Sequence, residues 1–269
     1  MSRETVDRAP TGVDGIEMGI GGINDFSATS SVSANSDASN VGGDASTSMG
    51  DLDSSALTGG WMHSASDSDV SGIATLDGGI SASSTAQAAA AEGDFDADGI
   101  TGLAIGVGGV LDLAGQAQVN GDVSASSVSG TADAASGANA SHTAGPIDKY
   151  NSNASTISGL DSVEIDVASD ASVLGTAVGS FTTTAESTDS AATAEANQDV
   201  FGIQAIDISV GGVGSIAAIA QDSNFVEASS VMGDASATAT VDAIGLDGGD
   251  ISISSDAVLT SSVSVDSAA

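Results

Sequence analysis

The stretch Gly202–Val210 reads GIQAIDISV, and from Ile206 onward it alternates strictly between apolar and polar residues. A period of two places every second side chain on the same face of an extended chain. The stretch therefore predicts a β-strand with one buried face and one solvated face. The same alternation returns in Val163–Val167, Ala235–Val241 and Ser262–Asp266.

The pattern G-[IL]-x-x-[apolar or G]-x-I-x-[VI] recurs along the chain and gives the repeat length. It occurs at Gly99–Val107, Gly159–Val167, Gly202–Val210 and Gly245–Ile253, with weaker copies from Gly15 and Gly72. The last three copies start 43 residues apart, and the interval before them is 60, which is one repeat plus a 17-residue insertion. Repeats of this length, each holding two to four strands, are typical of stacked β-architectures.

These observations predict an all-β fold, an elongated β-solenoid or a stacked β-sheet repeat with short turns. Clusters such as Gly42-Gly43-Asp44 and Asp247-Gly248-Gly249-Asp250 are expected to form the turns. A propeller usually fills the wedge between its blades with large aromatic residues, and seven aromatic residues are too few for that. A compact sandwich is the alternative to the elongated fold.

The chain divides into four predicted parts. Residues 1–14 form an N-terminal docking arm, residues 15–141 irregular β-repeats, residues 142–158 a linker or projecting loop, and residues 159–269 the regular 43-residue repeats. The arm carries two of the three cationic residues, Arg3 and Arg8, on an acidic chain. The predicted loop carries Tyr150, the one tyrosine. We expect these residues and Trp61 to bind partners.

Composition excludes several classes of function. The chain has 3 basic and 37 acidic residues, a formal net charge of −34, and no cysteine. Disulfides, thiolate zinc sites and thiol nucleophiles are therefore excluded. Nucleic-acid binding needs clustered Lys and Arg to neutralise phosphates, and this chain lacks them. We expect no transmembrane segment and no secretory signal, because no long apolar stretch follows the first residues.

The segment Asp94–Gly99 reads DFDADG, the first half of an Asp-rich calcium loop. We predict that Asp94, Asp96 and Asp98 bind a metal, with calcium as the cofactor. The twelfth position of the loop is Ile105 rather than a bidentate Glu, so an EF-hand is not expected. The predicted site is similar to the short Asp-rich turns found on β-structures. The alternative is an acidic turn without a metal.

No catalytic residues are predicted, and the chain is expected not to be an enzyme. Its two imidazoles, His63 and His142, lie in Ser-rich surroundings in which a neighbouring Ser carries no information. A β-helical polysaccharide depolymerase is the enzymatic alternative, since paired carboxylates suit glycoside cleavage.

At the level of class, the repeat and the composition of residues 15–269 resemble the Gly/Ala/Ser/Asp-rich β-structural proteins of bacteriophage fibres and appendages. Acidic repeat proteins of bacterial surfaces are similar. The resemblance implies a structural subunit of a virion, assembled as a homo-oligomer, with trimers common, and joined to other structural proteins through the N-terminal arm. The alternative is a surface filament or adhesin, exported through a C-terminal signal to the cell surface and dependent on calcium.

Overall fold

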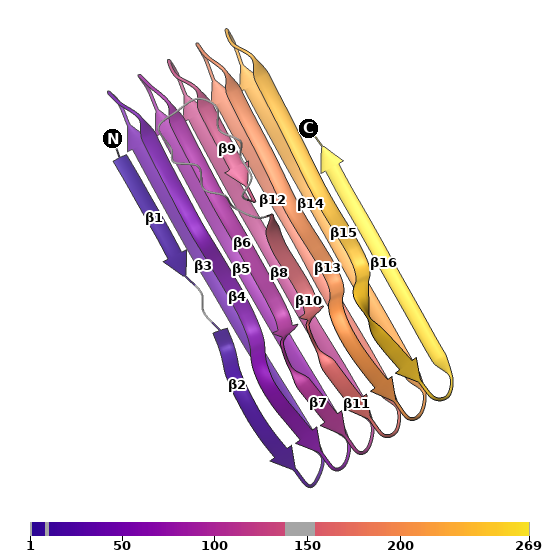
Figure 1. Cartoon of the computed structure of the whole chain (residues 1–269). Coiled ribbons are helices and arrows are strands. Elements are labelled where there is room, and N and C mark those ends of the chain that lie inside the picture. The colour runs from indigo at the N-terminus through magenta and orange to yellow at the C-terminus, as the bar shows by residue number, and fades with distance from the viewer. Residues whose placement is uncertain (1, 9–10, 138–153, 269) are drawn as a thin grey trace.

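The computed structural model describes residues 2–8, 11–137 and 154–268, and every regular element among them is a β-strand. The predicted all-β class is confirmed. The strands form two sheets, one of ten strands and one of six (Figure 1). The ten-stranded sheet contains β1 (Ser2–Arg8), β2 (Thr11–Ile20), β4 (Ala45–Ser64), β6 (Ala89–Thr101), β7 (Ala104–Val107), β9 (Ala132–Ser136), β10 (Ser155–Asp161), β11 (Glu164–Val167), β13 (Ala192–Val210) and β15 (Ala235–Ile253). The six-stranded sheet contains β3 (Asn24–Asn40), β5 (Ser68–Ser84), β8 (Leu111–Ser127), β12 (Ala171–Ser187), β14 (Gly214–Ser230) and β16 (Ala257–Ala268).

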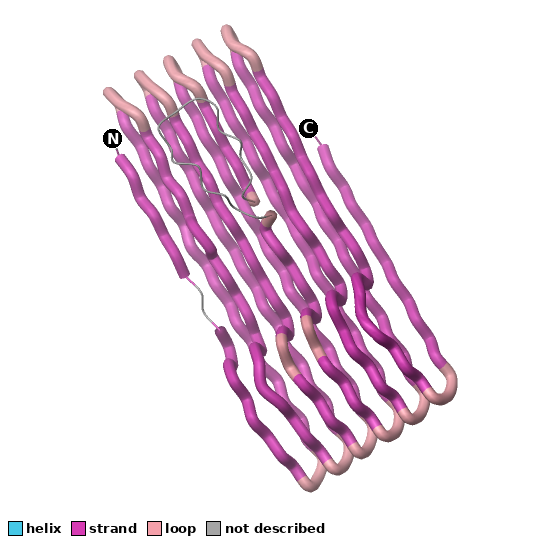
Figure 2. Tube along the Cα trace, in the orientation of Figure 1, coloured by secondary structure: helices cyan, strands magenta, loops and turns pink. Residues whose placement is uncertain are grey.

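The chain alternates between the two sheets, and all strand pairs within each sheet are parallel. One pass through the ten-stranded sheet and the return through the six-stranded sheet make one circuit, and the turns that connect the two sheets lie at the two ends of the strands (Figure 2). Each circuit lies beside the previous one, so the N- and C-terminal strands lie at opposite edges of the sheets (Figure 1).

The register repeats at the spacing found in the sequence. Ala171 pairs with Gly214 and Gly214 with Ala257, steps of 43 residues, whereas Leu111 pairs with Ala171 after 60 residues. The additional residues lie between the end of β9 and the start of β10, where residues 138–153 are outside the described part of the chain. The step is 43 residues on both sides of this insertion, and it is 44 residues between the first circuits, where Asn24 pairs with Ser68.

The two weaker sequence copies were placed in the wrong register. Val13 pairs with Leu57 and Leu57 with Ile100, so the counterparts of Gly99 are Gly12 and Ala56. Gly72 belongs to β5 in the other sheet, where it pairs with Gly115. The misplacement has a simple cause: both sheets carry Gly followed by alternating apolar residues, so local pattern alone does not separate them.

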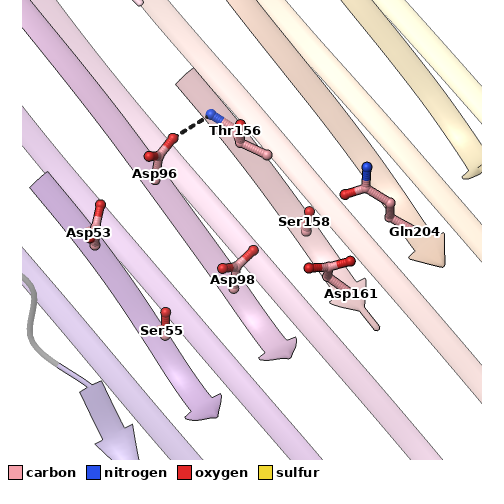
Figure 3. Close-up of a pocket in the computed structure, with 8 residues that line it drawn as sticks. All are labelled: Asp53, Ser55, Asp96, Asp98, Thr156, Ser158, Asp161 and Gln204. Atoms are coloured by element: carbon pink, nitrogen blue, oxygen red, sulfur yellow. Dashed lines mark hydrogen bonds between the residues drawn. The ribbon is translucent and has the colours of Figure 1, made fainter. Parts of the chain in front are cut away.

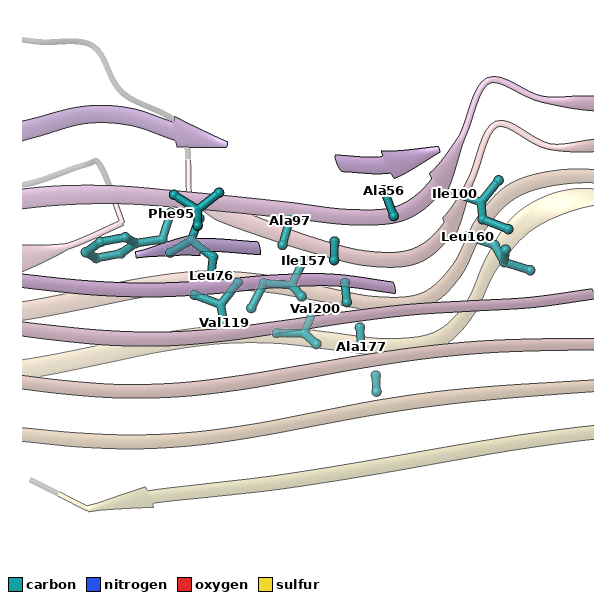
Figure 4. Close-up of a cluster of buried hydrophobic side chains, with 14 of the residues drawn as sticks. Ala56, Leu76, Phe95, Ala97, Ile100, Val119, Ile157, Leu160, Ala177 and Val200 are labelled. Carbon is teal, nitrogen blue, oxygen red and sulfur yellow. The ribbon is translucent and has the colours of Figure 1, made fainter. Parts of the chain in front are cut away.

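The core lies between the sheets and consists of small and branched side chains. In β8 and β12 alternate residues are buried, which confirms the predicted half-buried strands. Alanine, valine, leucine and isoleucine fill most of the interior (Figure 4). Phe95 and Phe181 are the bulkiest fully buried pair, with ring centroids 6.2 Å apart. Small inward residues allow the sheets to pack closely, as a thin core requires.

The repeated glycines mark the place where the two sheets come closest. Gly99, Gly159 and Gly202 in the ten-stranded sheet face Gly72, Gly115 and Gly175 in the other. A Cβ atom on Gly175 would lie 2.2 Å from the carbonyl oxygen of Gly202, and one on Gly72 would lie 2.3 Å from that of Gly99. A Cβ atom would clash with the facing backbone in these three circuits, which accounts for glycine at the first position of the pattern, whereas alanine occupies the equivalent positions Ala56 and Ala218 of other circuits.

A second row of residues bends the ten-stranded sheet just beyond this contact. Six residues, one in each circuit, have positive φ and occupy equivalent positions: Gly15, Gly59, Gly102, Ser162, Ala205 and Gly248. The cluster Asp247–Asp250, predicted as a turn, therefore lies inside β15 as part of this bend. Gly42 and Gly43 do form a turn, between β3 and β4.

Serine hydroxyls join successive turns at one end of the stack. The Ser127 hydroxyl accepts a hydrogen bond from the Gly130 amide (2.9 Å) and donates one to the Gln87 carbonyl of the preceding circuit (2.6 Å). Ser187 and Ser230 repeat this arrangement in the next two circuits. At the other end, the Asp67 carboxylate accepts from the Val110 amide, 43 residues away, at 2.9 Å.

Candidate functional site

Rows of acidic residues cross the outer faces of both sheets. Because strands pair in register, equivalent residues of successive circuits lie side by side, about 4.8 Å apart. One such row is Glu164, Asp207 and Asp250, and another is Asp25, Asp69 and Asp112. Like charges directly opposite each other on neighbouring strands destabilise a sheet. Their repetition concentrates negative potential on both faces.

Four aspartates surround a hollow on the outer face of the ten-stranded sheet (Figure 3). It is lined by side chains of four strands: Asp53 and Ser55 of β4, Asp96 and Asp98 of β6, Thr156, Ser158 and Asp161 of β10, and Gln204 of β13. Asp53 lies beside Asp96, and Asp98 beside Ser158. We call this set the acidic hollow.

Burial and mutual repulsion raise the pKa values of two carboxyl groups in the acidic hollow. The pKa of Asp96 rises to about 8, first because the group is buried and then because Asp94 carries the same charge. The pKa of Asp98 rises to about 7 through burial and then the charge of Asp161. The hydrogen bond from the Thr156 amide opposes the rise at Asp96. A bound cation would lower both pKa values, because it stabilises the ionised carboxylates.

The structure places the predicted calcium ligands on a strand rather than in a turn. Asp94, Asp96 and Asp98 alternate along β6 and share its outer face. Alternate residues of an extended strand lie about 6.6 Å apart, so the three carboxylates do not converge as they would in a tight loop. Within residues 2–8, 11–137 and 154–268, no three His, Cys, Asp or Glu side chains lie close enough to hold one metal ion.

Two of these aspartates hold the start of β10, where the chain returns from the insertion. Asp94 accepts a hydrogen bond from the Ser155 hydroxyl (3.2 Å), and that hydroxyl accepts from the Phe95 amide (3.0 Å). Asp96 accepts from the Thr156 amide at 2.6 Å. Both carboxylates therefore have a structural role beside any cation binding.

The residues predicted to bind partners are spread over the molecule. Arg3 and Arg8 belong to β1, which pairs with β4 at the edge of the ten-stranded sheet, so the described part of the predicted arm is a component of that sheet. Trp61 lies on β4, between Glu17 and Ala104 of the neighbouring strands, and 46% of its surface is exposed. Tyr150 lies outside the described residues.

A polar cluster inside the core was not predicted from the sequence. Gln198, Asp222 and Asn224 occupy inward positions of β13 and β14 and are almost fully buried. The Asn224 amide donates to Asp222 at 2.5 Å, and the Gln198 amide donates to the Ser136 hydroxyl at 3.1 Å. One oxygen of each of the three side chains has no hydrogen-bond partner. Burial raises the pKa of Asp222 to about 6. The sequence did contain a signal for this cluster, because its three polar residues stand at positions where the alternation in the other strands has apolar residues.

Comparison with protein-family models, with curated proteins and with solved structures finds no match. In the described residues, the structure contains no helix with the length and apolar character needed to cross a membrane.

Proposed function

We propose that the chain is a non-enzymatic structural subunit of a fibre or virion appendage and that its two sheets are the walls of a β-solenoid. The observation that carries the proposal is the in-register parallel pairing, in which each circuit lies on the one before it at a step of 43 or 44 residues, apart from the insertion. An arrangement of this kind can be extended by adding circuits, and its terminal edges remain open to pairing.

The core supports a structural role, because most of it is apolar and its side chains stack in rows from one circuit to the next. Apolar rows run through successive circuits, such as Met62, Ile105, Ile165 and Ile208. The imidazole of His63 points toward Gly106 of the neighbouring strand, where a Cβ atom would lie 2.9 Å from its Nδ1 atom. His63 lies at an exposed position, and under this proposal it packs beside Gly106.

A second function, a calcium-dependent filament or adhesin on a bacterial surface, is favoured by the acidic hollow. Its two raised pKa values and its crowded carboxylates would both be relieved by a divalent cation. Under this proposal calcium stabilises the folded chain outside the cell, where the ion is abundant.

Immunogold electron microscopy with antibodies raised against the purified chain tests the location. Regular labelling along virion tails or fibres supports the first function, and labelling of filaments on intact cells supports the second. Labelling confined to the interior of uninfected cells contradicts both.

A further inference from the structure

The two ends of the stack are exposed in different ways. At the C-terminal end, β15 pairs only with β13 and β16 only with β14 among the described strands. Leu259 and Val263 of β16 lie beside the inward residues Ile216 and Ala220, yet 59% and 49% of their surfaces are exposed, because none of the described strands lies on their other side. Ile251 of β15 is 37% exposed beside the buried Ile208.

At the N-terminal end, β1 and β2 pair only with β4, and β3 only with β5, among the described strands. Four apolar residues on this edge are half-buried and pack against the core from one side: Val13, Ile16, Met18 and Phe26. Both ends of the stack are thus edges of parallel sheets that carry incompletely covered apolar side chains.

The register makes these two edges complementary. Val13 and Leu246 are the first and last members of one row, and Met18 and Ile251 are the first and last members of another. Phe26 and Leu259 begin and end a third row, in the six-stranded sheet. If a second copy is placed one circuit beyond the first, its Phe26 lies beside Leu259 and its Met18 beside Ile251. Apolar rows then continue across the junction.

We propose that the N-terminal edge of a second copy of this chain binds to the C-terminal edge of the first. In this contact β15 pairs with β1 and β2 of the second copy, and β16 pairs with β3 of the second copy. This inference rests on the proposed function and names the contact that would build the fibre. A head-to-tail contact of this kind does not close on itself and produces an open filament.

The negative charge of the two copies should make assembly at this junction depend on the salt concentration. Asp14 of the second copy would lie beside Asp247, and each copy carries a net charge of −34. Arg3 and Arg8 of β1 place two of the three cationic residues on the edge that approaches β15, where by register they would lie beside Ser236 and Val241. Repulsion between the bodies nevertheless dominates at low salt, so screening should promote assembly.

Edge-blocking variants test the proposal by sedimentation velocity in 0.5 M NaCl and by electron microscopy. A C-edge variant carries Leu259→Asp and Val263→Asp, and an N-edge variant carries Val13→Asp and Met18→Asp. The matched control, Thr260→Asp with Ser262→Asp, adds the same charge to the outer face of β16. Wild type and control should form elongated multimers, and each blocked variant alone should show at least a tenfold lower multimer fraction.

Mixing the two blocked variants provides the decisive measurement. Each retains one intact edge, so the mixture should form dimers and nothing larger, which also shows that both variants are folded. Self-association of the N-edge variant alone, closed wild-type dimers, or wild type that stays monomeric at every salt concentration would overturn the proposed junction. Antibody labelling is independent of these results, so the fibre function and the junction can fail separately.

Discussion

Gly115 faces Gly159 across the two sheets, and a Cβ atom on Gly115 would lie 2.1 Å from the Gly159 carbonyl oxygen. The nearest atoms belong to the backbone and to Leu160, so the neighbours have little freedom to move aside. The distance between the sheets is therefore set by main chain against main chain at this point. It explains why the repeat begins with glycine.

Gly115→Ala should destabilise the fold by about 1–3 kcal/mol, as overpacking of a close-packed interior does. Urea unfolding followed by circular dichroism measures the change in the free energy of unfolding. Gly42→Ala is the matched control, because a Cβ atom on Gly42 meets nothing within 4 Å and its φ is not positive. Equal stabilities for the two variants would show that the sheets can separate without cost.

Ala205→Gly should stabilise the fold by about 1 kcal/mol. Ala205 has a φ of 49°, a left-handed conformation that costs a residue with a Cβ atom about 1–2 kcal/mol. The additional freedom of glycine in the unfolded chain removes part of that gain. Thermal unfolding by calorimetry would show the increase.

Gly248→Ala is the reciprocal test at the equivalent position of the next circuit. Gly248 has a φ of 66° and open space around it, so the substitution introduces backbone strain without a steric clash. We expect a loss of about 1 kcal/mol. A loss in the Ala205→Gly variant, or a gain in the Gly248→Ala variant, would contradict the assignment of the bend to left-handed φ.

Strand formation was predictable because it depends on local alternation. The apolar and polar residues of Ile206–Val210 already define the two faces of the strand, and the spacing of Gly159, Gly202 and Gly245 already gives the register between circuits. Both are periodic signals that require no knowledge of distant contacts. The all-β class and the 43-residue step follow from them.

The bend and the acidic hollow were not predictable in the same way. Ser162 and Ala205 adopt left-handed φ although neither residue type favours it, because their neighbours in the same row impose the bend. Asp53 joins Asp96 only through pairing of β4 with β6, and Asp161 approaches Asp98 across the insertion. Contacts between circuits, rather than local sequence, assemble these features. The pattern DFDADG by itself predicts a turn, because alternating Asp residues followed by Gly are typical of calcium loops.

Stability should fall as the pH rises from about 4 to about 8. In the folded chain the pKa values of Asp96 and Asp98 are about 8 and about 7, above their ordinary value of 3.8. Between these limits the folded state binds more protons than the unfolded state, so raising the pH favours unfolding. The stabilising protonation is complete below about pH 4 and is lost through the folded pKa values.

Asp98→Asn should flatten this profile and raise stability at pH 8 by about 1 kcal/mol or more, since one pKa unit corresponds to about 1.4 kcal/mol. Asp256→Asn removes the same charge from an exposed turn and serves as the control. Chemical denaturation at pH 5 and pH 8 gives the comparison. Identical profiles for wild type and Asp98→Asn would rule out the acidic hollow as the source of the pH dependence.

Cations should stabilise the chain, and calcium should do so beyond simple screening. Screening of the −34 net charge predicts a melting temperature that rises with NaCl. If carboxylates of the acidic hollow bind calcium, CaCl₂ should raise the melting temperature further than NaCl at equal ionic strength. At pH 7.5 it should also release protons from Asp96 and Asp98, whose folded pKa values lie near that pH.

Calorimetric titration in two buffers of different ionisation enthalpy measures that proton release directly. Asp53→Asn combined with Asp98→Asn should abolish the calcium-specific part and leave the response to NaCl intact, because the remaining acidic rows still repel one another. If CaCl₂ raises the melting temperature no more than NaCl does, and no protons are released, then calcium does not bind the acidic hollow specifically. The acidic rows would then act only through their collective charge, which keeps the long outer faces of the two sheets from pairing with one another.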